Sequence, residues 1–258
     1  NIIKDICVKG KITAVFTLID PELSLLAKHV DDFKKMGITV IVSPYEKCEL
    51  CLDKYAMFKF YENNGFKCAK TYFSFSDFES ALKHNKISFP VFIKPKKGSA
   101  SLNINVARNI NEARIIFESS PEMIIQEFLN GQELGIDVYV DMLSKKVVSI
   151  FIKEKISMRA GETDKARTIK SDVLFSIIND LVIKADLIGP IDIDVFNING
   201  EYYISEVNPR FGGGYPLAYE CGANFPKYII NNLRGIENIS QIGNYQEDIY
   251  MMKHDTLT

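Results

Sequence analysis

The sequence predicts an α/β fold built from α+β subdomains. Two observations support this prediction. Short apolar runs rich in β-branched residues alternate along most of the chain with longer segments of helical periodicity. Proline, glycine or asparagine separates many of these segments, as expected where strands and helices end. The chain shows neither an internal repeat nor a low-complexity linker.

The N-terminal segment has the pattern of an incomplete Rossmann-like unit. Residues 12–19 form an apolar, β-rich run, a helical pattern follows over residues 20–36, and residues 39–42 predict a second buried strand. The earlier strands of such a unit are missing, and the first residue is Asn1. We therefore expect the sequence to begin partway through a longer protein.

The remaining elements follow from periodicity and end signals. Asp53 is a suitable N-cap for the amphipathic helix at residues 54–63, and residues 155–168, which are charged and lack periodicity, predict a mobile loop. The other predicted helices cover residues 77–85, 111–119, 171–187 and 224–233, and the other predicted strands cover residues 90–94, 103–107, 123–127, 136–141, 146–152, 191–198 and 202–207.

Composition excludes several classes of function. The 258 residues are 47% hydrophobic and 25% charged with a net charge of −2, a balance without the basic excess of nucleic-acid-binding proteins. No apolar run reaches the length of a membrane span. The cysteines are five in number and scattered, which favours a reducing, cytoplasmic setting. We therefore expect small-molecule partners, with neither nucleic acid nor membrane.

The most informative stretch is Glu-Val-Asn-Pro-Arg-Phe-Gly-Gly-Gly, which runs from Glu206 to Gly214. The two-residue period of a strand places Glu206, Asn208 and Arg210 on one side of a strand end. Carboxylate and amide oxygens suit a hard cation such as Mg²⁺, and a neighbouring arginine suits the phosphate that such an ion accompanies. The alternative is a solvated strand end before a flexible loop, which fits any one of these residues better than it fits the whole set.

The turn before this motif decides whether Asp194 faces Glu206. A two-residue turn at Asn199-Gly200 pairs Asp194 with Ser205 and puts Glu206 on the opposite side of the sheet. A three-residue loop at residues 199–201 pairs Asp194 with Glu206 instead. Because a slip of one residue exchanges the two faces, a metal site with both carboxylates requires the three-residue loop.

Two lysines upstream are candidates for phosphate binding. Lys94 ends an apolar strand and precedes a small, polar loop at residues 96–101, whose backbone N–H groups could cradle phosphate oxygens. Lys54 lies in the first turn of its helix, where its charge opposes the helix dipole, so an anion is expected nearby. Solvated lysines are the alternative at both positions.

A third candidate segment is residues 124–133, a strand that runs into a linker. Main-chain groups of such a segment can bind an adenine edge, and a carboxylate beyond it can bind ribose hydroxyls. Glu127 and Glu133 are the candidates, although each is more often a surface carboxylate.

Taken in order, these segments resemble the ATP-grasp superfamily, and they look most like stand-alone relatives of the carbamoyl phosphate synthetase large subunit. The resemblance covers roughly residues 53–233, and its most specific part is the stretch from Glu206 to Gly214. The order and rough spacing of the motifs make coincidence improbable. The motifs that carry it are Asp53-Lys54, Phe89-Pro-Val-Phe-Ile-Lys-Pro95 with Gly98-Ser-Ala-Ser101, Ile125-Gln-Glu-Phe-Leu-Asn-Gly131, Asp192-Ile-Asp194 and Glu206-Val-Asn-Pro-Arg-Phe-Gly-Gly-Gly214.

The resemblance implies an ATP-grasp fold with three segments. These are a partial Rossmann-like N-terminal domain at residues 1–53, a small or lid subdomain at residues 54–127, and a C-terminal subdomain with a metal site at residues 128–258. The loop at residues 96–101 is poorer in glycine than is common in the family, so lid closure is expected to differ.

The resemblance also implies a role for each motif. Catalytic roles fall to Lys94 and to Arg210, which would stabilise the transferring phosphate or the acyl-phosphate. Lys155 and Arg159 would complete the phosphate site. The implied Mg²⁺ ligands are Asp194, Glu206 and Asn208, with Mn²⁺ as an alternative ion. The implied ATP-binding residues are Lys54, Lys94, Gly98, Ser99, Ser101, Glu127, Phe128, Leu129 and Glu133.

The implied activity is that of a carboxylate–amine ligase of the EC 6.3 kind, dependent on ATP and magnesium. ATP would phosphorylate a substrate carboxylate, and an amine or similar nucleophile would then displace the phosphate. Small-molecule carboxylates and amines would be its partners, and the chain could form a homodimer. Two alternatives remain: a nucleotide-binding regulatory or assembly protein that keeps the fold without turnover, and a different α/β kinase with a stable phosphorylated product.

Overall fold

The computed structural model describes residues 2–98, 104–159 and 161–254. Two compact units make up the chain. The first unit comprises residues 1–49, 135–193 and 207–258, and the second unit comprises residues 50–134 and 194–206. Both units are discontinuous in sequence, whereas the three expected domains are continuous, so the bounds of those domains stay a prediction.

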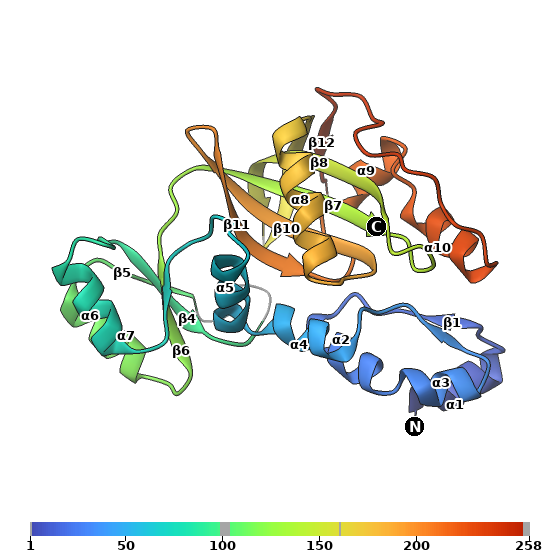
Figure 1. Cartoon of the computed structure of the whole chain (residues 1–258), viewed down its shortest axis with the longest axis horizontal. Helices are drawn as coiled ribbons and strands as arrows, with labels where there is room; N and C mark the ends of the chain where they lie inside the picture. Colours follow the sequence, from blue (N-terminus) through green and yellow to red (C-terminus); the bar gives the residue numbers. More distant parts are fainter. Residues whose placement is uncertain (1, 99–103, 160, 255–258) are drawn as a thin grey trace. The chain divides into compact units, whose positions relative to one another are not determined.

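The described residues form helices and strands in alternation over much of their length (Figure 1). The helices are α1 Ile2–Gly10, α2 Asp20–Lys28, α3 Val30–Lys35, α4 Tyr45–Leu52, α5 Lys54–Asn63, α6 Phe75–Lys83, α7 Ile110–Glu118, α8 Asp172–Lys184, α9 Tyr215–Glu220 and α10 Phe225–Leu233. The strands are β1 Ala14–Val15, β2 Thr39–Val40, β3 Thr71–Tyr72, β4 Val91–Pro95, β5 Asn105–Ala107, β6 Met123–Glu127, β7 Gln132–Val140, β8 Val147–Arg159, β9 Glu162–Ile169, β10 Gly189–Ile198, β11 Glu201–Asn208 and β12 Tyr250–Met252.

The second unit is built on a four-stranded sheet with the order β3-β6-β4-β5. β3 pairs with β6, and β4 pairs with both β6 and β5, all antiparallel. Alternate residues of β4 and β6, such as Val91, Ile93 and Ile125, are buried on one face. Helices α6 and α7 cover that face through Phe78 and Ala113 (Figure 1). The other side chains of β4, including Lys94, lie on the opposite face of the sheet.

The main core of the first unit lies around the long strands β7 and β8. Tyr139 and Phe151 are fully buried there, and they belong to one apolar cluster with Phe225 and Tyr245. The strands of the larger sheet follow the order β11-β10-β7-β8-β9-β12. Helix α8 packs on this sheet with four buried apolar side chains, and Ser171 caps it by accepting a hydrogen bond from Leu174 N.

The N-terminal segment is less regular than its sequence predicts. The expected strand at residues 12–19 shortens to β1, which pairs in parallel with β2. The expected helix over residues 20–36 divides into α2 and α3 at His29, whose φ of −109° departs from helical geometry. Parallel pairing of β1 with β2 agrees with the expected Rossmann-like pattern, although the strands are short.

The expected mobile loop at residues 155–168 is wrong. These residues form the end of β8 and most of β9, which pair as an antiparallel hairpin from Ile152–Ile169 to Arg159–Glu162. A register shift between Lys155 and Met158 interrupts the alternation of side chains. Charged residues on a hairpin with this irregularity show no clean two-residue period, which is why the strands were not visible in the sequence.

Local capping signals gave the most accurate bounds. Helix α5 covers the predicted residues 54–63, and the Asp53 carboxylate accepts hydrogen bonds from Tyr55 N and Ala56 N at 3.1 and 3.0 Å. Strand β6 also has its predicted bounds. The elements absent from the prediction are α1, α4, α9, β3, β9 and β12. No helix among the described residues is long and apolar enough to cross a bilayer.

Candidate functional site

Two lysines and a carboxylate meet in the second unit. Lys54 Nζ lies 3.4 Å from Glu206 Oε1 and donates a hydrogen bond to Gly98 O at 2.5 Å. Burial lowers the pKa of Lys94 to about 8; the charge of Glu206 opposes this shift and the charge of Lys54 adds to it. Glu206 is thus an anion beside Lys54 within the chain, and contact of Lys54 with phosphate stays a prediction. Lys54 and Lys94, from two separate motifs, thus lie near the Glu206 carboxylate of a third.

Backbone contacts fix Lys54 beside the end of β4. Lys54 N donates to Lys96 O at 2.9 Å, and Asp53 forms an isolated antiparallel bridge with Lys97. Lys96 Nζ lies 3.6 Å from Asp53 Oδ2 and 4.8 Å from the centre of the Phe73 ring. The residues just after β4 are thereby attached to the start of α5, so the sequence neighbours of Lys94 position Lys54.

We predict that nucleotide binding weakens as the pH rises through the pKa of Lys94. A lowered lysine pKa means that its ammonium is charged below about pH 8 and neutral above it. If Lys94 contacts phosphate, the dissociation constant for ATP should rise about tenfold between about pH 7 and about pH 9. Isothermal titration at several pH values measures this. Lys94→Arg is the matched control, because its guanidinium stays charged and the pH dependence should disappear; an unchanged pH profile would remove Lys94 from the phosphate site.

The turn between β10 and β11 has two residues. Strand β10 ends at Ile198 and β11 begins at Glu201, with Asn199 at φ 53° and Gly200 at φ 86° between them. Positive φ at both positions is the signature of a type I′ turn. The turn therefore has two residues and not the three that the metal hypothesis required. By itself this turn would pair Asp194 with Ser205, and the metal site at Asp194 and Glu206 stays a prediction.

Asp194 and Glu206 nevertheless act on the same buried group. Burial raises the pKa of the Tyr61 hydroxyl, and the charges of Cys51, Glu206, Cys68 and Asp194 raise it further. Tyr61 Oη has no hydrogen-bond partner among the described residues although its side chain is buried. The charges of Asp194 and Glu206 therefore both reach one buried hydroxyl.

The residues present fit a magnesium ion by their chemistry. Asp194 and Glu206 offer carboxylate oxygens, Asn208 offers an amide oxygen, and Mg²⁺ in proteins takes one or two carboxylates together with waters and substrate phosphates. The unpartnered Tyr61 hydroxyl could bond to such a water. The described residues contain no group of three or more His, Cys, Asp or Glu arranged for a metal.

Arg210 lies beyond the strand and is bound by two carboxylates. The chain turns after β11, where Arg210 N donates to Asn208 O at 2.8 Å, so the expected alternation stops at Asn208. The guanidinium donates to Asp20 through Nε at 2.7 Å and Nη2 at 3.1 Å, and through Nη1 to Asp192 at 3.0 Å. Asp20 and Asp192 hold Arg210 in place, and Asp20 was not found from the sequence.

Gly212 is required by the same network. A Cβ at this position would lie 2.6 Å from Asp192 Cγ, closer than real Cβ contacts. The first glycine of the motif therefore leaves room for the carboxylate that binds Arg210.

The predicted adenine segment follows β6. Glu127 Oε2 accepts a hydrogen bond from Lys70 N at 3.1 Å, and the Phe128 ring stacks on Phe92 with their centres 4.9 Å apart. Leu129 and Glu133 are half-buried. A contact between any of these residues and adenine stays a prediction. Of the predicted phosphate loop, Gly98 has φ 139°, which favours glycine, whereas Ser99 and Ser101 lie outside the described residues.

A fully buried ion pair was missed by the sequence reasoning. Lys153 Nζ donates to Asp137 Oδ2, and both side chains are almost inaccessible to solvent. Burial raises the pKa of Asp137, Lys153 opposes the shift, and Asp192 adds to it. A Cβ at Gly214 would lie 2.5 Å from Lys153 Cε, so the last glycine of the motif packs on the lysine stem.

The comparisons with known proteins agree with this set of motifs. A model of the ATP-grasp domain matches residues 51–214, and a model of the PylC-like N-terminal domain matches residues 1–41. The chain belongs to the ATP-grasp family. A phosphoribosylamine–glycine ligase of Fusobacterium nucleatum is 27% identical over 228 residues, which cover 76% of this chain and 53% of that protein.

Two further relatives extend this family match. A carbamoyl-phosphate synthase of Methanobrevibacter smithii is 26% identical over 263 residues, covering 96% of this chain and 71% of that protein. The biotin carboxylase domain of 2-oxoglutarate carboxylase from Hydrogenobacter thermophilus, solved with magnesium and ADP, has a TM-score of 0.77 at 17% identity and covers 96% of this chain and 59% of that one. This ATP-grasp chain thus spans only a little more than half the length of two of these three relatives, and the solved structure shows its fold alone.

Proposed function

We propose that this chain is an ATP- and magnesium-dependent ligase that activates a carboxylate as an acyl-phosphate for attack by an amine. The observation that carries the proposal is the cluster of Lys54, Lys94 and Glu206. Two lysines beside a carboxylate are suited to hold a phosphate chain together with its metal. The names of the relatives, a phosphoribosylamine–glycine ligase and a carbamoyl-phosphate synthase, support this reaction class.

The proposed reaction has two steps. A substrate carboxylate oxygen attacks the γ-phosphorus of ATP, the bond to the bridging oxygen of ADP breaks, and an acyl-phosphate forms. The amine nitrogen then attacks the acyl carbon, an N–C bond forms, phosphate leaves with the bonding electron pair, and the nitrogen loses a proton. Positioning and charge neutralisation supply the catalysis, so no covalent nucleophile of the protein is needed.

The residues of this chain have separate tasks in this scheme. Lys54 and Lys94 bind the phosphate oxygens, and Arg210 is positioned by Asp20 and Asp192 to stabilise charge on the acyl-phosphate. Magnesium, when bound through Asp194, Glu206 and Asn208, would neutralise phosphate charge and orient the γ-phosphate. Manganese would have the same ligand chemistry. Cytoplasmic location and a homodimer remain predictions that no contact in the chain addresses.

The test is ADP formation with a matrix of carboxylic acids and amines. We expect ADP release that depends on magnesium, on one acid and on one amine together, and mass spectrometry should detect the amide. ATP binding without turnover across the whole matrix would favour a regulatory or assembly protein. A stable phosphorylated acid formed without any amine would favour a kinase.

A further inference from the structure

The glycine run, residues 212–214, lies against charged side chains of the larger sheet. A Cβ at Gly212 would lie 2.6 Å from Asp192 Cγ on β10, and a Cβ at Gly214 would lie 2.5 Å from Lys153 Cε on β8. Both distances are shorter than real Cβ contacts, so the backbone of the run lies directly against these two side chains. Because Arg210 precedes the run by only two residues, whatever supports the run also determines where Arg210 lies.

Asp137 lies between these two supports. Its strand, β7, is hydrogen-bonded to β10 on one side and to β8 on the other. Lys153 Nζ donates to Asp137 Oδ2, and only 1% and 2% of the two side chains are exposed. Burial raises the pKa of the Asp137 carboxyl, Lys153 opposes this shift, and the charge of Asp192 adds to it. Asp137 and Asp192 are therefore neighbouring carboxylates that pair with different cations.

Arg210 is the cation of the second carboxylate. Four hydrogen bonds hold its guanidinium: two go to Asp20, and one each goes to Asp192 and to the backbone oxygen of Phe211. Three carboxylates thus share two cations in this part of the first unit. A buried carboxylate that loses its own cation gains free energy by pairing with a neighbouring one, because an uncompensated buried charge is costly.

We propose that Lys153 is a positioning residue for Arg210. Its ion pair with Asp137 keeps that carboxylate from drawing the guanidinium out of its place, and its stem supports the glycine run. Conversely, Asp137 keeps the Lys153 ammonium from competing with the guanidinium for Asp192. The consequence for catalysis rests on the proposed function, in which Arg210 stabilises the acyl-phosphate, whereas the placement of Arg210 does not.

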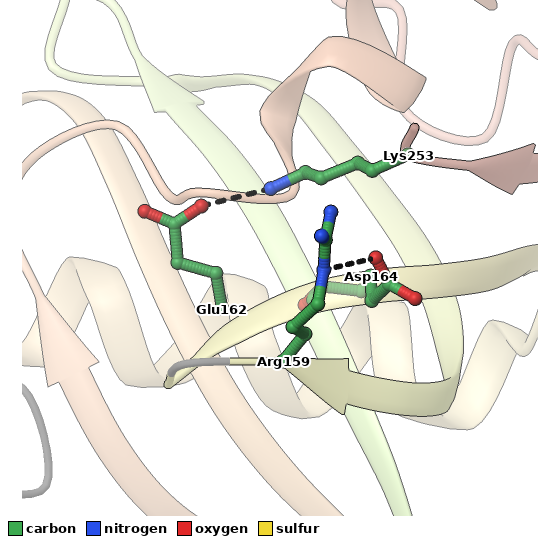
Figure 2. Close-up of a pocket in the computed structure, with 5 residues that line it drawn as sticks. Arg159, Glu162, Asp164 and Lys253 are labelled. Carbon is green, nitrogen blue, oxygen red and sulfur yellow. Dashed lines mark hydrogen bonds and ion pairs between the residues drawn. The ribbon is translucent and has the colours of Figure 1, made fainter. Parts of the chain in front are cut away.

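An exposed ion pair beside the same glycine run provides the contrast. A Cβ at Gly213 would lie 3.1 Å from Glu162 Cδ, and Glu162 Oε2 accepts a hydrogen bond from Lys253 Nζ at 2.9 Å (Figure 2). Both side chains line an open, charged cavity of about 240 Å³, and their exposed fractions are 64% and 27%. Water can solvate Glu162 when Lys253 is removed, so this pair should have no influence on Arg210.

The test is the exchange of the Arg210 Nε proton with water, measured by NMR on the whole chain isotopically labelled in arginine. The sequence contains six arginines, so the variant Arg210→Lys assigns the signal. We expect Lys153→Met to accelerate this exchange about tenfold or more, because the proton loses its fixed acceptor. Asp137→Asn, which keeps the shape of the side chain, should accelerate it as well. The double variant Asp137→Asn/Lys153→Met leaves neither charge and should exchange at nearly the rate of the parent chain.

Lys253→Met is the matched control, because it removes a lysine from the exposed pair beside the same glycines, and its exchange rate should equal that of the parent chain. Circular dichroism checks that each variant is folded. If Lys153 acted by packing alone, the effect of Lys153→Met would persist in the double variant and Asp137→Asn would have none. That pattern, or unchanged exchange in folded Lys153→Met, would overturn the inference. If a single variant does not fold, accelerated exchange in the folded double variant contradicts the inference and a parent-like rate supports it.

ADP formation on the same samples separates this inference from the ligase proposal. In an active chain, Lys153→Met should lower kcat about tenfold or more with little change in the KM for ATP, and the double variant should recover most of kcat. If the parent chain forms no ADP, the ligase proposal fails while the exchange rates still decide the placement of Arg210. If ADP forms and the exchange rates do not change, the positioning inference fails alone.

Discussion

Replacing Glu206 with Gln is expected to abolish magnesium-dependent ADP formation while leaving the chain folded. The substitution removes the charge that lies 3.4 Å from Lys54 Nζ and the carboxylate that would bind the metal. Loss of one preorganised electrostatic contact typically costs about 100-fold or more in rate, and loss of a metal ligand adds to this. The measurement is the ADP formation rate as a function of magnesium concentration, with circular dichroism as the check on folding.

Glu201→Gln is the matched control on the same strand. Glu201 begins β11 with a half-exposed side chain that pairs with Lys67 at the surface, so its removal should change the rate less than twofold. If Glu206→Gln kept most of the magnesium-dependent activity, the assignment of Glu206 to the metal would be wrong.

The second large effect concerns stability. Lys153→Met is expected to lower the free energy of unfolding by about 3–5 kcal/mol, because it leaves the Asp137 carboxylate buried without its partner. Urea denaturation followed by circular dichroism and tyrosine fluorescence measures the change, since the chain has no Trp. The lysine stem also supports Gly214, so the variant should loosen the end of the glycine motif.

Two comparisons make this prediction specific. The double variant Asp137→Val/Lys153→Met removes both charges and should recover a large part of the lost stability, because no buried charge remains. Lys67→Met, which breaks the exposed pair with Glu201, should cost no more than about 1 kcal/mol. Equal losses in Lys67→Met and Lys153→Met would contradict a stabilising role for the buried pair.

Sequence reasoning succeeded where the signal is local. The N-cap Asp53 fixes the start of α5 through hydrogen bonds two and three residues away, and the helix has its predicted bounds. It failed where charged residues and a register shift hid the two-residue period of a strand. Residues 155–168 were predicted as a mobile loop because their charges hide the strand period, yet they pair over the length of the β8–β9 hairpin.

The turn at Asn199-Gly200 was predicted from a local signal, whereas the positions of the neighbouring carboxylates were not. The dipeptide predicted a tight hairpin, and the structure has that hairpin with positive φ at both residues. The metal hypothesis assumed a three-residue loop that pairs Asp194 with Glu206, whereas the turn has two residues. The metal site itself stays a prediction. The influence of both carboxylates on Tyr61 appears only when α5 is packed beside the strands.

The sequence by itself determined the family motifs, the alternation of helices and strands, and the residue types available for phosphate and metal. These depend on short-range spacing and on chemical identity, which a sequence contains directly. Tertiary structure alone decided that Asp20 binds Arg210 across 190 residues of chain, that Lys153 and Asp137 are buried together, and that three glycines border an arginine network and a charged cavity. Such partners depend on long-range packing, because burial and pairing of charges are set by which distant segments the fold brings into contact.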